Sequence, residues 1–369
     1  MQKTVFIFGA GASTETGGPL MNTFLDRARD LLAGGKVEDS RDDFQGVFKA
    51  LVRLRDVFYK SGIDLDNIES VFGAFEMGRI IGKLGGCPED EIASLAQSIR
   101  RLIVRTLDES IRYTYHPERQ QASPPVGYGE FVSLIKEMNR KGGCGSACSL
   151  LTFNYDIALD YALTHADIPY DYYLEPPTDK NALRLLKLHG SLNWSRCSKC
   201  ERTKAQRLSM EKVRELASSR LVSSFTLPAA AIMAQSRCEH CSGSLTGQPI
   251  IVPPTWNKTE GHGELTTIWK QAAIELGQAE NIICIGYSLP ESDLFFRYLF
   301  ALGTVGEAHL RRFWVFDPDP VHLVEERYRR LIGRGIEHRF RFFNDDAGLF
   351  GKTVQGRGAL WEAIQAVGQ

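Results

Sequence analysis

The stretch TVFIFGAGAST, residues 4 to 14, decides the fold expected for this chain. Its first half is a short apolar run, which predicts a buried strand of a parallel sheet. The glycines at Gly9 and Gly11 let the backbone approach a phosphate, whose charge then lies at the amides that begin the next helix. The usual dinucleotide-binding turn has a third glycine three residues after Gly11, and Thr14 stands there instead. A tight turn without a ligand therefore remains an alternative.

Four other stretches share this pattern of an apolar strand followed by polar residues. They are SLLTFNYD (149 to 156), LRLLKLHGS (183 to 191), NIICIGYSLPESD (281 to 293) and RFWVFDPDP (312 to 320). In open α/β sheets, ligands bind beyond the carboxyl ends of the strands. We therefore expect the polar residues at these ends to line one crevice, with the side chains of Asn154 and His189 facing solvent. Alternatives for single residues are a turn-capping Asn154, a His189 bonded to backbone, and an Asp317 that only opens a turn.

The segments between these strands favour helices. Residues 19 to 115 have apolar positions at helical spacing and interrupt the alternation of strands, so they predict a helical insertion. Residues 116 to 130 are rich in proline, glycine and polar residues, which predicts a connection leading to a helix at 130 to 140. A further amphipathic helix is expected at 262 to 276. The arginine-rich residues 327 to 342 predict a solvated helix face and an edge strand.

Two pairs of cysteines have the spacing of a zinc site. Cys197 and Cys200 form one C-x-x-C pair, Cys238 and Cys241 form the other, and 37 residues separate the pairs. Four thiolates in this arrangement suit a closed tetrahedral structural zinc site. We therefore expect one structural zinc site formed by these four cysteines. Two redox or incidental pairs are the alternative, although neither pair opens a helix after a strand.

Composition limits the class of protein. The chain has 369 residues, of which 43% are hydrophobic and 24% charged, and its formal net charge is -1. These values fit one large domain with insertions, or two domains. The near-zero charge gives no support for direct nucleic-acid binding. With neither a signal-like N-terminus nor an apolar run long enough for a membrane span, we expect a cytoplasmic protein.

These motifs together carry a family resemblance. GAGAS, TFNYD, KLHGS, the paired C-x-x-C knuckles and IGYSL occur in the order seen in sirtuins, and the chain resembles the prokaryotic sirtuin-like group over residues 3 to about 320. The resemblance implies a single α/β domain over residues 1 to 369, with a Rossmann-like parallel sheet that binds NAD⁺. It further implies that the helical insertion and a zinc-ribbon module at residues 192 to 248 lie within this domain. It also implies two sets of cofactor-binding residues: Gly9, Ala10, Gly11 and Ser13 for the pyrophosphate, and Gly286, Ser288 and Asp317 for the adenosine side.

The resemblance gives three further residues catalytic roles. It implies that Asn154 positions a water or the ribose, that Asp156 faces the nicotinamide carboxamide, and that His189 is the general base. Cleavage of the nicotinamide–ribose bond builds oxocarbenium character on the ribose, and these residue types supply a positioning group, a contact for the leaving amide and a base.

The chain also departs from the sirtuin deacetylases. Met21 and Asn22 stand where the deacetylases have Phe-Arg, Phe153 stands where they have glutamine, and PIIVPPTWNK (249 to 258) replaces the Phe-Gly-Glu segment of the acyl-lysine channel. We therefore expect an NAD⁺ glycohydrolase that forms nicotinamide and ADP-ribose, similar to NADases of bacterial antiphage defence.

The alternatives are an NAD-dependent protein deacylase or ADP-ribosyltransferase, and a non-catalytic NAD or ADP-ribose sensor that regulates a partner ATPase or nuclease. Expected partners are further copies of the chain in a homo-oligomer and, from the resemblance, a HerA-like hexameric ATPase or an Argonaute-like protein.

Overall fold

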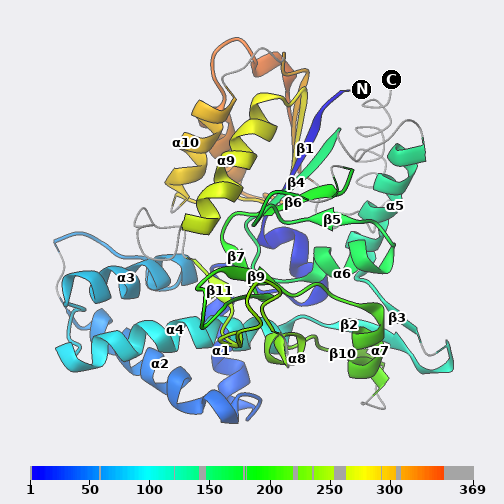
Figure 1. Ribbon diagram of the computed structural model, residues 1–369. Helices are drawn as coiled ribbons and strands as arrows, with labels where there is room; N and C mark the ends of the chain where they lie inside the picture. Colours follow the sequence, from blue (N-terminus) through cyan, green and yellow to red (C-terminus); the bar gives the residue numbers. More distant parts are fainter. Residues whose placement is uncertain are drawn as a thin grey trace.

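A seven-stranded sheet forms the centre of the computed structural model (Figure 1). The structure describes residues 2–57, 60–119, 121–140, 147–177, 179, 181–218, 223–234, 237–252, 263–291, 293–304 and 309–344. The strand order is β14-β13-β12-β1-β4-β6-β5, and all neighbouring strands are parallel. The strands are β1 (Thr4–Phe8), β4 (Cys148–Thr152), β5 (Tyr170–Asp171), β6 (Leu183–Lys187), β12 (Asn281–Ile285), β13 (Arg312–Phe316) and β14 (Phe340–Phe343). The α/β fold with a Rossmann-like parallel sheet is confirmed, and β14 is the expected edge strand.

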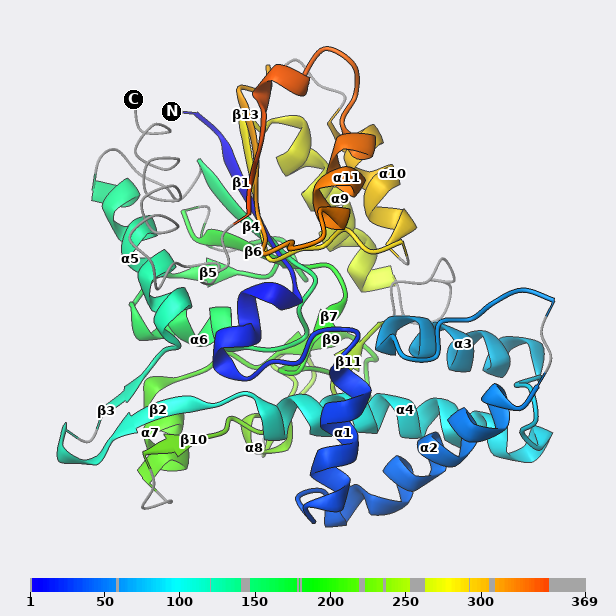
Figure 2. The ribbon, with the colours of Figure 1, turned by 180° about the vertical axis from the view of Figure 1, so that it is seen from behind.

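Helices cover both faces of this sheet, which explains why β1, β4 and β12 are buried along their whole length. On one face, α5 (Val126–Arg140) packs its Phe131 ring edge-on against Phe6 and Phe8 of β1, and it lies beside α6 (Ala158–His165). On the other face lie α9 (Gly263–Gly277), α10 (Leu294–Gly303) and α11 (Leu323–Leu331) (Figure 2). There Phe313 of β13 stacks on Phe300 and meets Tyr328.

Four helices occupy most of the segment between β1 and the next strand along the chain. They are α1 (Phe24–Ala33), α2 (Arg41–Arg55), α3 (Ile68–Ile81) and α4 (Glu89–Ser110). The long α4 packs against the other three, and the group lies beyond the carboxyl ends of the sheet strands (Figure 2). The predicted helices of this segment are therefore present. The division of the chain at residues 19 and 115 stays a prediction.

The connection predicted at residues 116 to 130 differs from the structure. The strands β2 (Tyr113–His116) and β3 (Gln121–Ser123) form an antiparallel hairpin, and β10 (Ser224–Phe225) extends it. In addition, α5 begins at Val126 instead of residue 130. The hairpin was missed because its strands are only three and four residues long and are flanked by polar residues and prolines.

The cysteine-bearing segment contains short elements. They are β7 (Gly190–Ser191), β8 (Trp194–Arg196), β9 (Thr203–Ala205), α7 (Met210–Ser218), α8 (Ala229–Met233) and β11 (Ile250–Ile251). Strand β8 pairs with β9, and β11 pairs with β7.

None of the described helices is long and apolar enough to span a membrane.

Candidate functional site

A cavity of about 760 Å³ lies where the carboxyl ends of β1, β4, β12 and β13 meet the helical group. Its volume is in the range of sites for small molecules and cofactors. Nine residues named from the sequence line it: Gly9, Ala10, Gly11, Ser13, Asn154, Asp156, Gly286, Ser288 and Asp317. Four of the five predicted strand ends therefore converge on one crevice, whereas His189 at the end of β6 is not part of its lining.

The glycine turn after β1 packs closely against the turn after β12. A Cβ atom on Gly9 would lie 2.5 Å from the carbonyl oxygen of Gly286, and one on Gly11 would lie 2.9 Å from the same atom. The amide of Gly11 donates to that oxygen at 2.9 Å. The close packing of the two turns therefore requires glycine at both positions, whether or not a ligand binds there. The helix that follows the turn is a seven-residue 3₁₀-helix, Ala10–Thr16.

Asn154, Ser13 and Asp156 form a hydrogen-bonded polar group at the cavity wall. The Asn154 amide donates from Nδ2 to the carbonyl oxygen of Gly9 at 2.8 Å and to Ser13 Oγ at 3.2 Å. Ser13 Oγ donates to Asp156 Oδ2 at 2.8 Å. Because that proton is committed, Tyr128, 2.9 Å away, must donate its hydroxyl proton to Ser13 Oγ. Tyr128 was not foreseen from the sequence, since it belongs to α5 and reaches this group only through the packing of α5 on β1.

Asp156, the carboxylate of this group, is buried. Burial raises the pKa of Asp156, while the nearby Lys187 charge and hydrogen bonds from Ala158 and Ser13 act in the opposite direction. Lys187 is itself fully buried; its Nζ donates to the backbone oxygen of Asp156 at 2.5 Å and to Asp160 Oδ2 at 3.0 Å. This buried cation holds the backbone after β4 in place.

The residues proposed for the adenosine side lie at the other end of the cavity lining, after β12 and β13. Asp317 is 9% exposed, and burial together with the charge of Asp319 raises its pKa to about 7. Arg327 of α11 also lines the cavity and donates to the backbone oxygen of Ser288 at 3.2 Å. Asp319 accepts hydrogen bonds from the first backbone amides of α11, so it is a helix cap and not a cavity residue.

His189 differs from the expectation that it faces the solvent-filled crevice. It follows β6, is 2% exposed and is absent from the cavity lining. Its ring contacts the edge of Phe153, with centroids 5.1 Å apart, and Phe153 in turn lines the cavity. His189 Nε2 lies 3.2 Å from Asp293 Oδ1. Asn154 thus faces the cavity as expected, whereas His189 lies behind an aromatic ring.

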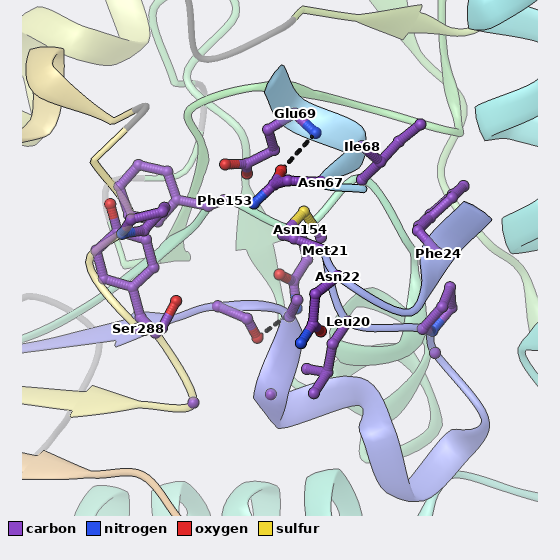
Figure 3. Close-up of a pocket in the computed structure, with 18 of the residues that line it drawn as sticks. Leu20, Met21, Asn22, Phe24, Asn67, Ile68, Glu69, Phe153, Asn154 and Ser288 are labelled. Atoms are coloured by element: carbon purple, nitrogen blue, oxygen red, sulfur yellow. Dashed lines mark hydrogen bonds between the residues drawn. The ribbon is translucent and has the colours of Figure 1, made fainter. Parts of the chain in front are cut away.

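The positions that depart from the deacetylases lie on the cavity wall. Met21, Asn22 and Phe153 all line it, and Figure 3 shows Asn22 and Met21 near Asn154. The N-terminus of α3 closes another side with Asn67, which caps the helix, and Glu69. Residues 253 to 258 of the segment PIIVPPTWNK lie outside the described residues. Because Phe153 and not glutamine precedes Asn154, the cavity wall next to Asn154 is more apolar than a Gln-Asn pair would make it.

The four cysteines lie together, away from the cavity lining. Their sulfur atoms are all within 4.8 Å of one another, with Cys197–Cys241 at 3.5 Å and Cys200–Cys238 at 3.6 Å. Four sulfurs bound to one zinc at about 2.3 Å would be about 3.8 Å apart, so the cluster fits a structural zinc ion. The prediction of a four-cysteine site is thus supported by geometry.

Comparisons with known proteins find similarity to solved structures only. No family model and no curated protein matches the chain. Similar solved structures include Sir2Tm bound to a propionylated peptide (14% identity, TM-score 0.40, covering 98% of this chain and 93% of that one) and a Sir2–p53 peptide–NAD⁺ complex (15%, 0.40, 97% and 94%). A structure described as the basis for the mechanism and regulation of Sir2 enzymes has 13% identity and a TM-score of 0.43, covering 99% and 94%. At these TM-scores the likeness carries no conclusion about this chain.

Proposed function

We propose that the chain is an NAD⁺ glycohydrolase that converts NAD⁺ and water to nicotinamide, ADP-ribose and a proton. The observation that carries the proposal is the single cavity in which the glycine turn, the Asn154–Ser13–Asp156 group and Asp317 meet. This order of residues matches the parts of the cofactor: phosphates at the turn, the nicotinamide ribose at Asn154, and the adenosine side at Asp317.

The roles of the residues follow from their hydrogen bonds. Both amide hydrogens of Asn154 are used by Gly9 and Ser13, so its amide oxygen is the atom that accepts from a ribose hydroxyl or the attacking water. Asp156 is proposed to bind the carboxamide of the leaving nicotinamide. The bond between C1′ and the nicotinamide nitrogen breaks, the water oxygen bonds to C1′, and His189 takes the water proton. Because Phe153 lies against His189, its ring must turn aside for this transfer.

Nicotinamide release by the pure protein tests the proposal. The wild type should release nicotinamide from NAD⁺ without any acylated peptide, and Asn154→Ala should lower the rate by at least about 100-fold while the protein stays folded. Asn22→Ala is the matched control, since Asn22 lines the same cavity but has no assigned role. Release that depends on an acyl-lysine peptide would move the protein to the deacylase alternative.

The burial of His189 favours a second candidate, a non-catalytic sensor of NAD⁺ or ADP-ribose that regulates a partner ATPase or nuclease. A sensor needs the cavity but no base. A rise in melting temperature with NAD⁺ that is lost in Ser288→Trp, without any nicotinamide release from the wild type, would support the sensor and exclude the enzyme.

The biological setting is proposed from the resemblance alone: antiphage defence in the cytoplasm by depletion of NAD⁺, with a HerA-like ATPase or an Argonaute-like protein as partner. A homo-oligomer is also proposed, and the exposed apolar side chains of Val52, Ile80 and Ile81 on the helical group suit a contact between copies. A monomeric mass by light scattering, with and without NAD⁺, would contradict the oligomer.

A further inference from the structure

We propose that Asp293 is a positioning residue for His189, which fixes the imidazole and selects the tautomer in which Nδ1 is the basic nitrogen. The expected effect of Asp293 on turnover rests on the proposed function. The position of the proton on His189 does not, since it can be measured in the protein alone.

The two side chains form a buried pair. His189 Nε2 lies 3.2 Å from Asp293 Oδ1, and the residues are 2% and 1% exposed. Among the residues that the structure describes, neither of these two atoms has a partner in hydrogen-bond geometry, and at this distance a small rotation of the ring or the carboxyl brings them into line. Buried polar atoms rarely stay without a partner, so we take each to be the partner of the other. A base oriented by a carboxylate is the arrangement on which nucleophile activation commonly relies.

The backbone of each residue is also held. The carbonyl oxygen of His189 accepts from the amide of Val252 at 2.9 Å, and the amide of Asp293 donates to the carbonyl oxygen of Pro290 at 3.1 Å. The pair therefore joins the end of β6 to the beginning of α10 across the carboxyl edge of the sheet. With both backbones fixed, the imidazole orientation is set by the contact between the two side chains.

The chemistry of the pair sets the tautomer. An ionised carboxylate only accepts hydrogen bonds, so neutral His189 must carry its proton on Nε2 to satisfy Asp293. The lone pair is then on Nδ1, which becomes the nitrogen that accepts the proton of the attacking water.

Tyr287 makes this assignment testable. Its hydroxyl donates to the other carboxylate oxygen, Asp293 Oδ2, at 2.7 Å. In Asp293→Asn the side-chain oxygen will stay with that donor, so the amide NH₂ must face His189. Nε2 then has to accept, and the proton moves to Nδ1. In Tyr287→Phe/Asp293→Asn the amide is free to turn and present its oxygen to His189 again.

Activity of the variants gives the first readout. Asp293→Asn should lower kcat for nicotinamide release by at least about 100-fold, with a much smaller change in KM, because the base has the wrong tautomer. Tyr287→Phe alone should have a small effect, since the ring still stacks on Phe153 at 4.2 Å. The double variant should recover activity relative to Asp293→Asn, an outcome that a purely structural role for Asp293 does not give.

The ¹⁵N NMR signals of His189, assigned by their loss in His189→Gln, give the second readout in mildly alkaline buffer. We expect the Nε2–H tautomer in the wild type, the Nδ1–H tautomer in Asp293→Asn, and a return toward Nε2–H in the double variant. An unchanged tautomer in folded Asp293→Asn, or wild-type nicotinamide release by it, would overturn the inference. If the tautomers change as stated while the wild type releases no nicotinamide, the positioning role stands and the glycohydrolase proposal fails.

Discussion

At the scale of single residues, Asp317 lines the cavity and also lowers the stability of the fold as pH rises. Its carboxyl is almost fully buried, and burial and Asp319 raise its pKa from 3.8 to about 7. Between these two values the unfolded chain has lost this proton while the folded protein keeps it. The contribution of Asp317 to the free energy of unfolding therefore falls as pH rises through this window, by about 1.4 kcal/mol per pH unit.

Replacement of Asp317 by Asn should remove this dependence. Without NAD⁺, we expect Asp317→Asn to match the wild type below the lower pKa and to be more stable above neutral pH, because no charge has to be buried. Its affinity for NAD⁺ should be weaker if Asp317 holds the adenosine side. Urea unfolding across this pH range is the measurement. Asp319→Asn is a second test: it should lose stability because Asp319 caps α11, and it should show a weaker pH dependence because the Asp319 charge helps to raise the Asp317 pKa. A parallel pH dependence in Asp317→Asn and the wild type would contradict the account.

The residues of the cavity could be named from the sequence because each follows a strongly apolar strand. Asn154, Asp156 and Asp317 are of this kind, and the sheet topology brings their strands side by side. The orientation of a side chain at a strand end cannot be read in the same way. His189 was expected in the crevice, and only the packing of Phe153 and the position of Asp293 explain why it is buried.

At the scale of elements, the buried ion pair between Lys187 and Asp160 joins β6 to α6. Both side chains are fully buried, and Asp160 also accepts a hydrogen bond from Tyr172. The sequence LRLLKLHGS predicted β6 but not this pair, because the burial of a lysine at the end of an apolar strand depends on a carboxylate supplied by a different element.

Removal of one partner should be worse than removal of both. Lys187→Met leaves an unpaired buried carboxylate and should lower the free energy of unfolding by about 3–5 kcal/mol. The double variant Lys187→Met/Asp160→Asn should be more stable than Lys187→Met, since Asp160 is then no longer a buried charge without its cation, while Asp156 loses the Lys187 charge equally in both variants. Equilibrium unfolding in urea measures both values. A double variant less stable than Lys187→Met would contradict the expectation and show that Asp160 stabilises the fold through other contacts, such as its hydrogen bond with Tyr172.

At the scale of the whole molecule, the zinc ion is expected to hold the cysteine-bearing segment together. Cys197→Ser/Cys200→Ser should lose zinc and lower expression and melting temperature together, because a structural zinc contributes about 10–16 kcal/mol in small zinc-finger domains. Cys87→Ser is the matched control, since Cys87 is outside the cluster. Full zinc content in the double variant, measured by atomic emission, would contradict the site.

The spacing of the cysteines made this site predictable, because two C-x-x-C pairs fix four ligands without knowledge of the segment between them. The β2–β3 hairpin was not predictable, since two strands of three and four residues carry too little hydrophobic pattern. The order of the strands in the sheet was not predictable from single motifs, because it depends on the parallel connections along the whole chain. These connections place β12 and β4 on either side of β1.

The central claim is that water is the acceptor in the cleavage of NAD⁺ at this cavity. The most direct measurement is mass spectrometry of the products formed by the pure protein from NAD⁺ in H₂¹⁸O, without any peptide. We expect nicotinamide and ADP-ribose in equal amounts, with one ¹⁸O atom in each newly formed ADP-ribose, and at least about 100-fold less of both products from Asn154→Ala. NAD⁺ that is bound but stays intact, or ADP-ribose found attached to a protein instead of released, would contradict it.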